Sequence, residues 1–262
     1  MLLPLHVTEE RSSMSDIVKA FSNGKAIIPY VAAGDPDADS TVKFVLALEK
    51  AGADMVQIGI PFSDPIADEP AQKDAALRGL ASGANLDAAF GIVDTVRKTS
   101  DVPIAFVSYL NPIFGYGYEA FFSRCAECKV SAVFVIDMPY EERTELLQFA
   151  KAQGVGLISA IYPASERRLE VLAKNSDGFI YLVPMKASAD EVESMISIIR
   201  SHTDVPVTIA FGAGRPEDAK STVGSADGLV IGSGVVDIIG RCGADAETEI
   251  SDYIQGIEKN LQ

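Results

Sequence analysis

The sequence predicts an α/β fold of the (β/α)8 type, a TIM barrel, with an extra N-terminal helix. Eight short runs rich in Val and Ile recur along the 262 residues, separated by stretches with helical patterning. The runs are nearly continuous rather than alternating in hydrophobicity, which is typical of parallel strands buried on both faces. The length is close to the roughly 250 residues of one such barrel. We therefore expect a single domain over residues 1–262.

The eight predicted strands are residues 26–33, 54–60, 103–110, 132–137, 156–162, 178–183, 207–212 and 228–232. Helical stretches are expected at 15–24, 41–52, 88–100, 118–128, 141–154, 165–176, 189–202, 216–224 and about 245–261. The first of these precedes the first strand and is expected to cover the bottom of the barrel. Strand–helix alternation also fits a doubly wound sheet. The count of eight, the lack of G-x-G-x-x-G after the first strand and the polar residues after many strands favour the barrel.

Charge and composition exclude several classes of partner. The chain has 22 basic and 37 acidic residues, a formal net charge of −15. A surface this acidic repels nucleic acid and anionic membranes, so neither is expected as a partner. The sequence contains no run of about 18 apolar residues, so no transmembrane helix is expected. Residues 1–13 also lack a signal-peptide pattern. Three sparse cysteines indicate a reducing compartment, the cytoplasm.

Cys125 and Cys128 have a C-x-x-C spacing inside a predicted helix. A redox pair or a metal site is one interpretation, and two helix residues on the same face is the other. A metal site needs further ligands, and the chain contains only two histidines. We favour the structural interpretation and expect neither a metal nor a cofactor.

The connection after the second strand, residues 61–83, is the longest in the chain and is expected to be a functional loop. It begins with the run PFSDPIADEP, which includes Asp64, Pro65, Asp68 and Glu69. Polar loops at the carboxyl ends of barrel strands form the active sites of this fold. A solvated surface loop is the alternative, but long ordered loops in compact domains are usually functional.

Two glycine-containing loops follow the seventh and eighth strands and predict a phosphate site. The sequence FGAGRP occupies 211–216, and IGSGVV occupies 231–236 at the start of a helix. These loops commonly bind phosphate in barrels, through backbone N–H groups and a helix N-terminus. The candidates are Gly212, Ala213, Gly232, Ser233 and Gly234. Tight turns alone are the alternative role for the glycines.

Several of these motifs together resemble the α subunit family of tryptophan synthase, over about residues 15–261. The segments that carry the resemblance are IPYVAAGDP (28–36), IGIPFSDPIADEP (58–70), SYLNPIFGYG (108–117), VIDMPYEE (135–142), FIYL (179–182) and FGAGRPEDA (211–219). The resemblance implies a β/α barrel that cleaves indole-3-glycerol phosphate into indole and glyceraldehyde 3-phosphate. It also implies a β subunit as partner, with Asp64 and Pro65 in the loop that meets it.

The family's retro-aldol cleavage protonates C3 of the indole, holds the indole N–H and deprotonates a glycerol hydroxyl. The resemblance assigns the N–H to Asp68 and the proton transfer to a strand-two glutamate, whose position Gln57 occupies here. Glutamine does not exchange a proton near neutral pH. Glu69 also departs from the family, which has Gly after this Asp. The resemblance places Tyr30, Tyr109, Asn111, Phe134 and Tyr181 around the substrate.

Three explanations of Gln57 remain open: a substitution that traps substrate, a paralogue with another reaction, or a family member that uses Glu69 instead. The family's lid after strand six, with its Gly-x-Thr-Gly element, is also shortened here, and Lys186 lies in the remaining loop. The sequence therefore predicts a lyase of this family. The alternatives are a divergent paralogue for another small phosphorylated substrate, or a non-catalytic partner of a β subunit.

Overall fold

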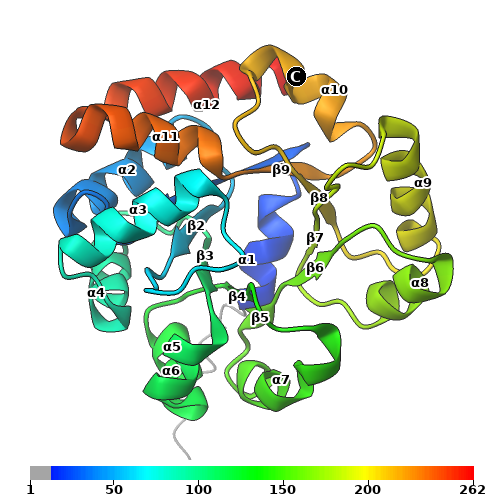
Figure 1. The fold of residues 1–262 in the computed structure, drawn as a ribbon, viewed down its shortest axis with the longest axis horizontal. Helices are drawn as coiled ribbons and strands as arrows, with labels where there is room; N and C mark the ends of the chain where they lie inside the picture. Colours follow the sequence, from blue (N-terminus) through cyan, green and yellow to red (C-terminus); the bar gives the residue numbers. More distant parts are fainter. Residues whose placement is uncertain (1–12) are drawn as a thin grey trace, which may run out of the picture.

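The computed structural model describes residues 13–262 as a barrel of parallel strands surrounded by helices (Figure 1). The strands are β1 Ala26–Ala32, β2 Val56–Gly59, β3 Ile104–Ser108, β4 Ala132–Val135, β5 Gly156–Leu157, β6 Ser159–Ile161, β7 Ile180–Leu182, β8 Val207–Ala210 and β9 Gly228–Ile231. The helices are α1 Ser13–Ala20, α2 Ala38–Lys50, α3 Pro70–Ala81, α4 Leu86–Val96, α5 Leu110–Tyr116, α6 Tyr118–Glu127, α7 Thr144–Ala152, α8 Glu166–Lys174, α9 Ala189–Arg200, α10 Ala219–Val223, α11 Ser233–Cys242 and α12 Glu247–Leu261. Short 3-10 turns occupy Tyr140–Glu142, Pro216–Asp218 and Gly243–Asp245.

The strand order confirms the predicted barrel. The order is β5-β4-β3-β2-β1-β9-β8-β7-β6, with β1 paired to β2 on one side and to the last strand on the other. A doubly wound sheet does not join its first strand to its last in this way. The sequence analysis expected no signal peptide in residues 1–13. Residues 1–12 of that segment lie outside the described residues, so this expectation stays a prediction.

The predicted fifth strand is split at Ile158 into β5 and β6, and this split forms the closing seam of the barrel. The Ile158 N–H donates to the Val133 carbonyl at 2.9 Å on one side. Beyond the split, β6 pairs with β7. The buried guanidinium of Arg143, just before α7, donates to the Leu157 carbonyl at 2.8 Å and to Ser159 Oγ at 2.7 Å. These bonds brace the seam where the strand is interrupted.

The predicted loop 61–83 is wrong in its second half, because residues 70–81 form α3. Pro70 occupies the first turn, where its missing N–H costs nothing. Ala75, Ala76 and Gly79 are buried, so the helix packs through small residues rather than through a strongly apolar stripe. The short helix α5 was also not expected from the sequence.

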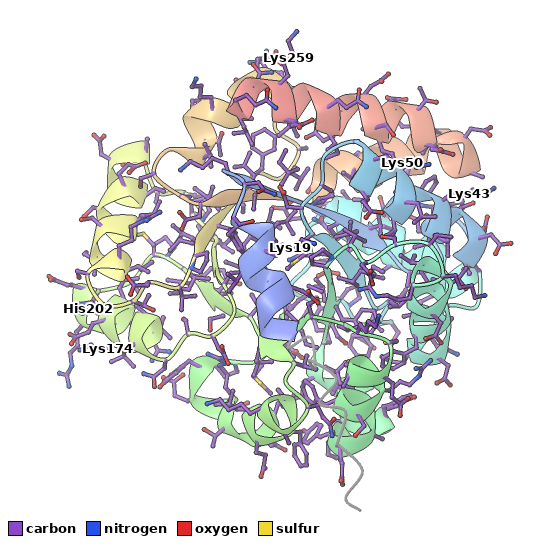
Figure 2. All side chains as sticks on the ribbon, turned by 180° about the vertical axis from the view of Figure 1, so that it is seen from behind. Lys19, Lys43, Lys50, Lys174, His202 and Lys259 are labelled. Atoms are coloured by element: carbon purple, nitrogen blue, oxygen red, sulfur yellow. The ribbon has the colours of Figure 1, made fainter. Side chains whose placement is uncertain are left out.

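Helix α1 covers the amino-terminal end of the barrel, as the sequence predicted. Figure 2 shows it from behind, with Lys19 in front of the centre of the barrel. Ile17 is fully buried and packs with the side chains that fill the barrel interior. A Cβ atom at Gly156 would lie 2.9 Å from Ile17 Cδ1, so the first residue of β5 must be small for this contact. The barrel is therefore plugged at this end and open to ligands only at the other.

Replacement of Ile17 by alanine tests whether α1 is part of the core. We expect Ile17→Ala to lower the free energy of unfolding by about 2–5 kcal/mol, the usual cost of removing a buried aliphatic side chain. Val18 on the same helix is 64% exposed, and Val18→Ala should change the stability by less than about 0.5 kcal/mol. Denaturant unfolding measures both. Equal effects of the two variants would contradict the docking of α1.

Candidate functional site

A cavity of about 330 Å³ opens at the carboxyl ends of the strands. Because every strand pair is parallel, these ends meet at one rim, where barrels bind their ligands. The cavity contains eight of the residues that the sequence analysis proposed: Tyr30, Gln57, Asp68, Glu69, Phe134, Tyr181, Gly212 and Gly232. Gln72, Tyr162 and Met185 also line it, together with apolar side chains from several strands. The structure thus brings most of the candidate residues together.

Gln57 lies on β2 beside Tyr30 of β1, which is its register partner across the sheet. Its side chain is only 3% exposed, and its amide nitrogen has no hydrogen-bond partner in the protein. An unpartnered buried donor is costly, because the group has lost its water and gained nothing in return. The Nε2 donor of Gln57 is therefore available to a ligand in the cavity.

Asp68 is fixed by Tyr109, which holds the loop 61–69 onto the barrel. The Tyr109 hydroxyl donates to Asp68 Oδ1 at 3.1 Å and accepts from the Ala67 N–H at 3.0 Å. Burial raises the pKa of Asp68, while the hydrogen bond from Tyr109 and the charge of Lys73 oppose this effect. Burial also raises the pKa of Tyr109 to about 12, so this tyrosine stays a proton donor. Asp68 is accordingly an oriented carboxylate at the cavity wall.

Glu69 reaches across to the loop after β9. Ser233 Oγ donates to Glu69 Oε2 at 2.6 Å and lies 3.4 Å from Oε1 of Gln72. Ser233 begins α11, so the Glu69 carboxylate lies at a helix N-terminus, where backbone N–H groups favour negative charge. The amide of Gln72 lies against Gly232, where an added Cβ would approach it to 2.5 Å. The first turn of α3 thus packs directly on the predicted phosphate loop.

The five predicted phosphate residues differ in their availability. Gly212 and Gly232 line the cavity, and the Ser233 hydroxyl faces the side chains of Glu69 and Gln72. Gly234 is buried, and its N–H already donates to the Gly212 carbonyl at 3.1 Å. Ala213 is exposed and lies outside the cavity lining. Gly212, Gly232 and the Ser233 hydroxyl therefore lie at the cavity, whereas Gly234 and Ala213 do not line it.

The predicted substrate-contacting residues also divide. Phe134 and Tyr181 meet edge to face, with ring centroids 5.7 Å apart, and form an apolar wall. Burial and then the nearby negative charge of Asp68 raise the pKa of Tyr30, so its hydroxyl keeps its proton. Tyr109 is at the edge, bonded to Asp68. Asn111 is exposed on the first turn of α5 and does not line the cavity, because the chain turns outward into that helix.

Sequence reasoning missed Gln72 because the whole stretch 61–83 was interpreted as a loop. A helix beginning at Pro70 places residues 69 and 72 on adjacent turns, and both then face Ser233. After β7, Lys186 is exposed and lies outside this cavity, whereas its neighbour Met185 lines it with positive φ. Lys186 is therefore not a cavity residue in this structure.

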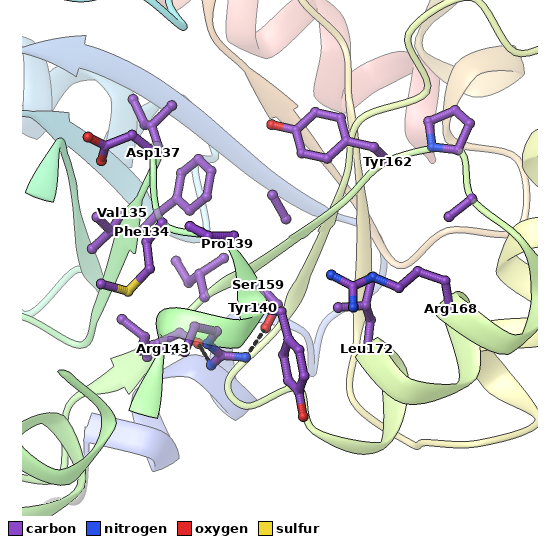
Figure 3. Close-up of a pocket in the computed structure, with 17 residues that line it drawn as sticks. Phe134, Val135, Asp137, Pro139, Tyr140, Arg143, Ser159, Tyr162, Arg168 and Leu172 are labelled. Atoms are coloured by element: carbon purple, nitrogen blue, oxygen red, sulfur yellow. Dashed lines mark hydrogen bonds between the residues drawn. The ribbon is translucent and has the colours of Figure 1, made fainter. Parts of the chain in front are cut away.

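A second cavity of about 390 Å³ adjoins the first and shares Phe134, Ile136 and Tyr162 with it. Figure 3 shows Phe134 and Tyr162 in its upper part and Arg143, bonded to Ser159, below them. Its lining contains neither of the carboxylates Asp68 and Glu69. The smaller cavity therefore contains Asp68 and Glu69, and the larger one, which Arg143 and Arg168 line, extends it.

Neither cysteine of the C-x-x-C pair faces the cavity. Cys125 and Cys128 are buried and unoxidised at the end of α6, and burial raises the pKa of the Cys128 thiol to about 11. Within residues 13–262, no three His, Cys, Asp or Glu side chains gather as a metal would require. The same residues contain no helix long and apolar enough to cross a membrane. The pair is part of the hydrophobic core.

Comparison with known proteins agrees with this barrel. The family model described as Tryptophan synthase alpha chain matches residues 18–261. The chain belongs to the tryptophan synthase alpha chain family. The alpha chain of Lacticaseibacillus casei is 41% identical over 251 residues, covering 93% of this chain and 94% of the relative. That of Alkaliphilus metalliredigens is 37% identical, covering 90% and 91%.

Solved structures of the tryptophan synthase alpha family superpose closely on the barrel. The alpha subunit from Legionella pneumophila has a TM-score of 0.88 at 27% identity, covering 95% of this chain and 98% of that one. A chain from the tryptophan synthase a2b2 complex of Pyrococcus furiosus has a TM-score of 0.84 at 32% identity, covering 90% and 98%. The recognition made from the motifs is thereby confirmed.

The contact between Tyr109 and Asp68 gives a test of the site that needs no substrate. A hydrogen bond to the ionised form lowers a carboxyl pKa, so Tyr109→Phe should raise the pKa of Asp68 further. Titration of the labelled Asp68 carboxyl carbon by NMR measures this. Tyr118→Phe is the control, because that hydroxyl bonds the exposed Glu145 instead. An unchanged or lower Asp68 pKa in Tyr109→Phe would contradict the orientation described above.

Proposed function

We propose that this chain is the α component of a tryptophan synthase and cleaves indole-3-glycerol phosphate to indole and glyceraldehyde 3-phosphate. The observation that carries the proposal is that a chain matching the family over residues 18–261 has one cavity lined by two carboxylates and by the glycines of the last two loops. Gly212, Gly232 and Ser233 form an anion cradle that takes the phosphate. The apolar wall of Phe134 and Tyr181 takes the indole ring, with Asp68 holding the indole N–H.

The reaction is a retro-aldol cleavage that consumes no cofactor. A proton is added to C3 of the indole, and the charge this creates on the ring is stabilised by the Asp68 carboxylate. The hydroxyl on the adjacent glycerol carbon then loses its proton, the C–C bond breaks, and its electron pair restores the indole. This chemistry requires a general acid and then a general base near the same bond, and one carboxyl group can fill both roles in turn.

The proposed partner is a tryptophan synthase β subunit, which would accept the indole. The structural relative from Pyrococcus furiosus is described as part of an a2b2 complex. Asp64 and Pro65 belong to the rim loop 61–69, and Ile66 beside them is 82% exposed. We propose that this loop meets the β subunit.

Indole release measures the proposed activity directly. We expect purified protein, alone or mixed with a tryptophan synthase β subunit, to release indole from indole-3-glycerol phosphate. Asp68→Asn keeps the size of the side chain but removes its charge, and kcat should fall about 10²–10⁴-fold. Asp39→Asn, an exposed acid at the start of α2, serves as the control and should leave kcat unchanged.

The other outcomes identify the alternatives. A protein that releases no indole but is stabilised against heating by glycerol 3-phosphate is a paralogue for another phosphorylated substrate, because ligand binding raises stability by mass action. A protein that shows neither effect but activates a β subunit is a non-catalytic partner. Each of these results would contradict the lyase proposal.

A further inference from the structure

Glu69 has an unusual place at the junction of a loop and a helix. It is the N-cap residue of α3, with extended backbone angles, but its side chain makes no capping bond to its own helix. N-cap side chains normally satisfy the free N–H groups of the first turn. The Glu69 carboxylate instead accepts a hydrogen bond from the Ser233 hydroxyl, with 2.6 Å between the two oxygens, across the rim of the cavity.

This contact lies in the anion cradle itself. Ser233 and the N-terminus of α11 are the donors that a substrate phosphate would use, and the Glu69 carboxylate occupies the Ser233 hydroxyl. A phosphate that takes this hydroxyl must displace the carboxylate, because two anions in contact repel each other. Substrate binding therefore has to move Glu69 away from Ser233.

Gln57 supplies the second observation. It is buried on β2 with an unpartnered amide nitrogen, and it lines the same cavity as Glu69. An amide can hold a hydroxyl oxygen but cannot accept or deliver a proton near neutral pH. Asp68 is bonded to Tyr109. Asp68 and Glu69 are the two carboxyl groups that line the cavity. Only Glu69 has a hydrogen bond, to Ser233, that the substrate phosphate would break.

We propose that Glu69 is the proton-transfer residue of this chain. The substrate phosphate releases it from Ser233, and it then transfers protons at C3 of the indole and at the hydroxyl of the adjacent glycerol carbon. This inference rests on the proposed lyase function. The short glycerol chain places the reacting hydroxyl within a side chain's length of the phosphate, and Glu69 starts at the phosphate end. Gln57 is then a positioning residue, which donates its free N–H to the hydroxyl oxygen.

The step balances with one carboxyl group. On release from Ser233 the Glu69 carboxylate takes up one proton from water, because a second negative charge beside the phosphate is unfavourable. This acid form then delivers the proton to C3 of the indole. The resulting carboxylate takes the proton of the glycerol hydroxyl, whose O–H electron pair forms the aldehyde C=O bond. The C–C bond breaks, and its electron pair restores the double bond of indole. Glu69 ends the transfer in the acid form in which it began it, and no oxidant or other reactant is needed.

Exchanging the two side chains tests the proposal at constant charge and composition. Glu69→Gln keeps the shape and the acceptor for Ser233 but cannot transfer a proton. We expect its kcat for indole release to fall about 10²–10⁴-fold, the usual loss for a general acid–base group. The KM should not rise and the melting temperature should not change, whereas a purely structural role would alter both. The swap Q57E/E69Q should recover indole release relative to E69Q.

Asp74→Asn removes a comparable negative charge from the exposed face of the same helix and is the matched control, expected to keep full activity. If E69Q keeps the kcat of the unaltered protein, the role of Glu69 is overturned while the lyase function stands. If only variants carrying Q57E release indole, Glu69 is again overturned, and the barrel is a lyase that lost its acid–base group. If neither the unaltered protein nor Q57E/E69Q releases indole, the proposed function fails, and the role of Glu69 fails with it.

Discussion

The closing seam of the barrel is the constraint on which the site depends. The ring of parallel strands is complete only because β5 and β6 are two halves of one run, bonded on either side to β4 and β7. Arg143 braces the break with bonds to Leu157 and Ser159. A buried guanidinium is costly unless its donors are used, and here its two terminal nitrogens donate to oxygens of the interrupted strand and to the Asn175 carbonyl. Closure then brings β4 and β7 together across the seam, so that Phe134 and Tyr181 meet and line one cavity with Gln57 of β2.

The loop 61–69 carries most of the chemistry and is held at its carboxyl-terminal end by three hydrogen bonds. Tyr109 holds Ala67 and Asp68, while Ser233 holds Glu69. Beyond it, Arg78 of α3 makes a two-bond ion pair with Asp35, a fully buried carboxylate, at 2.7 and 2.8 Å. Removing one member of such a buried pair leaves an uncompensated charge, so α3 is firmly anchored. Pre-positioned carboxylates need little rearrangement before they act, and only the Glu69 contact lies in the path of the ligand.

The sequence predicted the elements that burial determines. Strands covered on both faces show as short apolar runs, so all eight were located, and the amphipathic helices between most of them followed. Helix α3 was missed because it packs through alanines and a glycine and leaves a polar face outside, a pattern that resembles a loop. The seam at Arg143 could not be predicted, because a basic residue in a helical stretch gives no sign of burial until the strand beside it is interrupted.

The same limit explains the outcome at the site. Motifs located Asp68, Gln57 and the glycines after β8 and β9, because Gln57 lies on a strand, the others follow strands, and strand ends converge. The motifs did not indicate which of these residues have a free hydrogen-bond donor facing the cavity. The Gly234 N–H already donates to the Gly212 carbonyl, and Asn111 lies on α5, which turns away from the cavity. The contact of Glu69 with Ser233 joins two loops far apart in the chain and appears only in three dimensions.

The net charge of −15 explains why the contact between Glu69 and Ser233 affects ligand binding. An acidic surface offers no long-range attraction to a phosphate ester, so the anion must be bound locally, by backbone N–H groups and a hydroxyl at a helix N-terminus. Those donors favour any anion, including one from the chain itself. Because Glu69 holds the cradle's hydroxyl, binding of the phosphate and release of the carboxylate are one exchange. A chain with an amide at position 57 thereby keeps a carboxyl group beside the bond to be broken, placed there by the substrate's own charge.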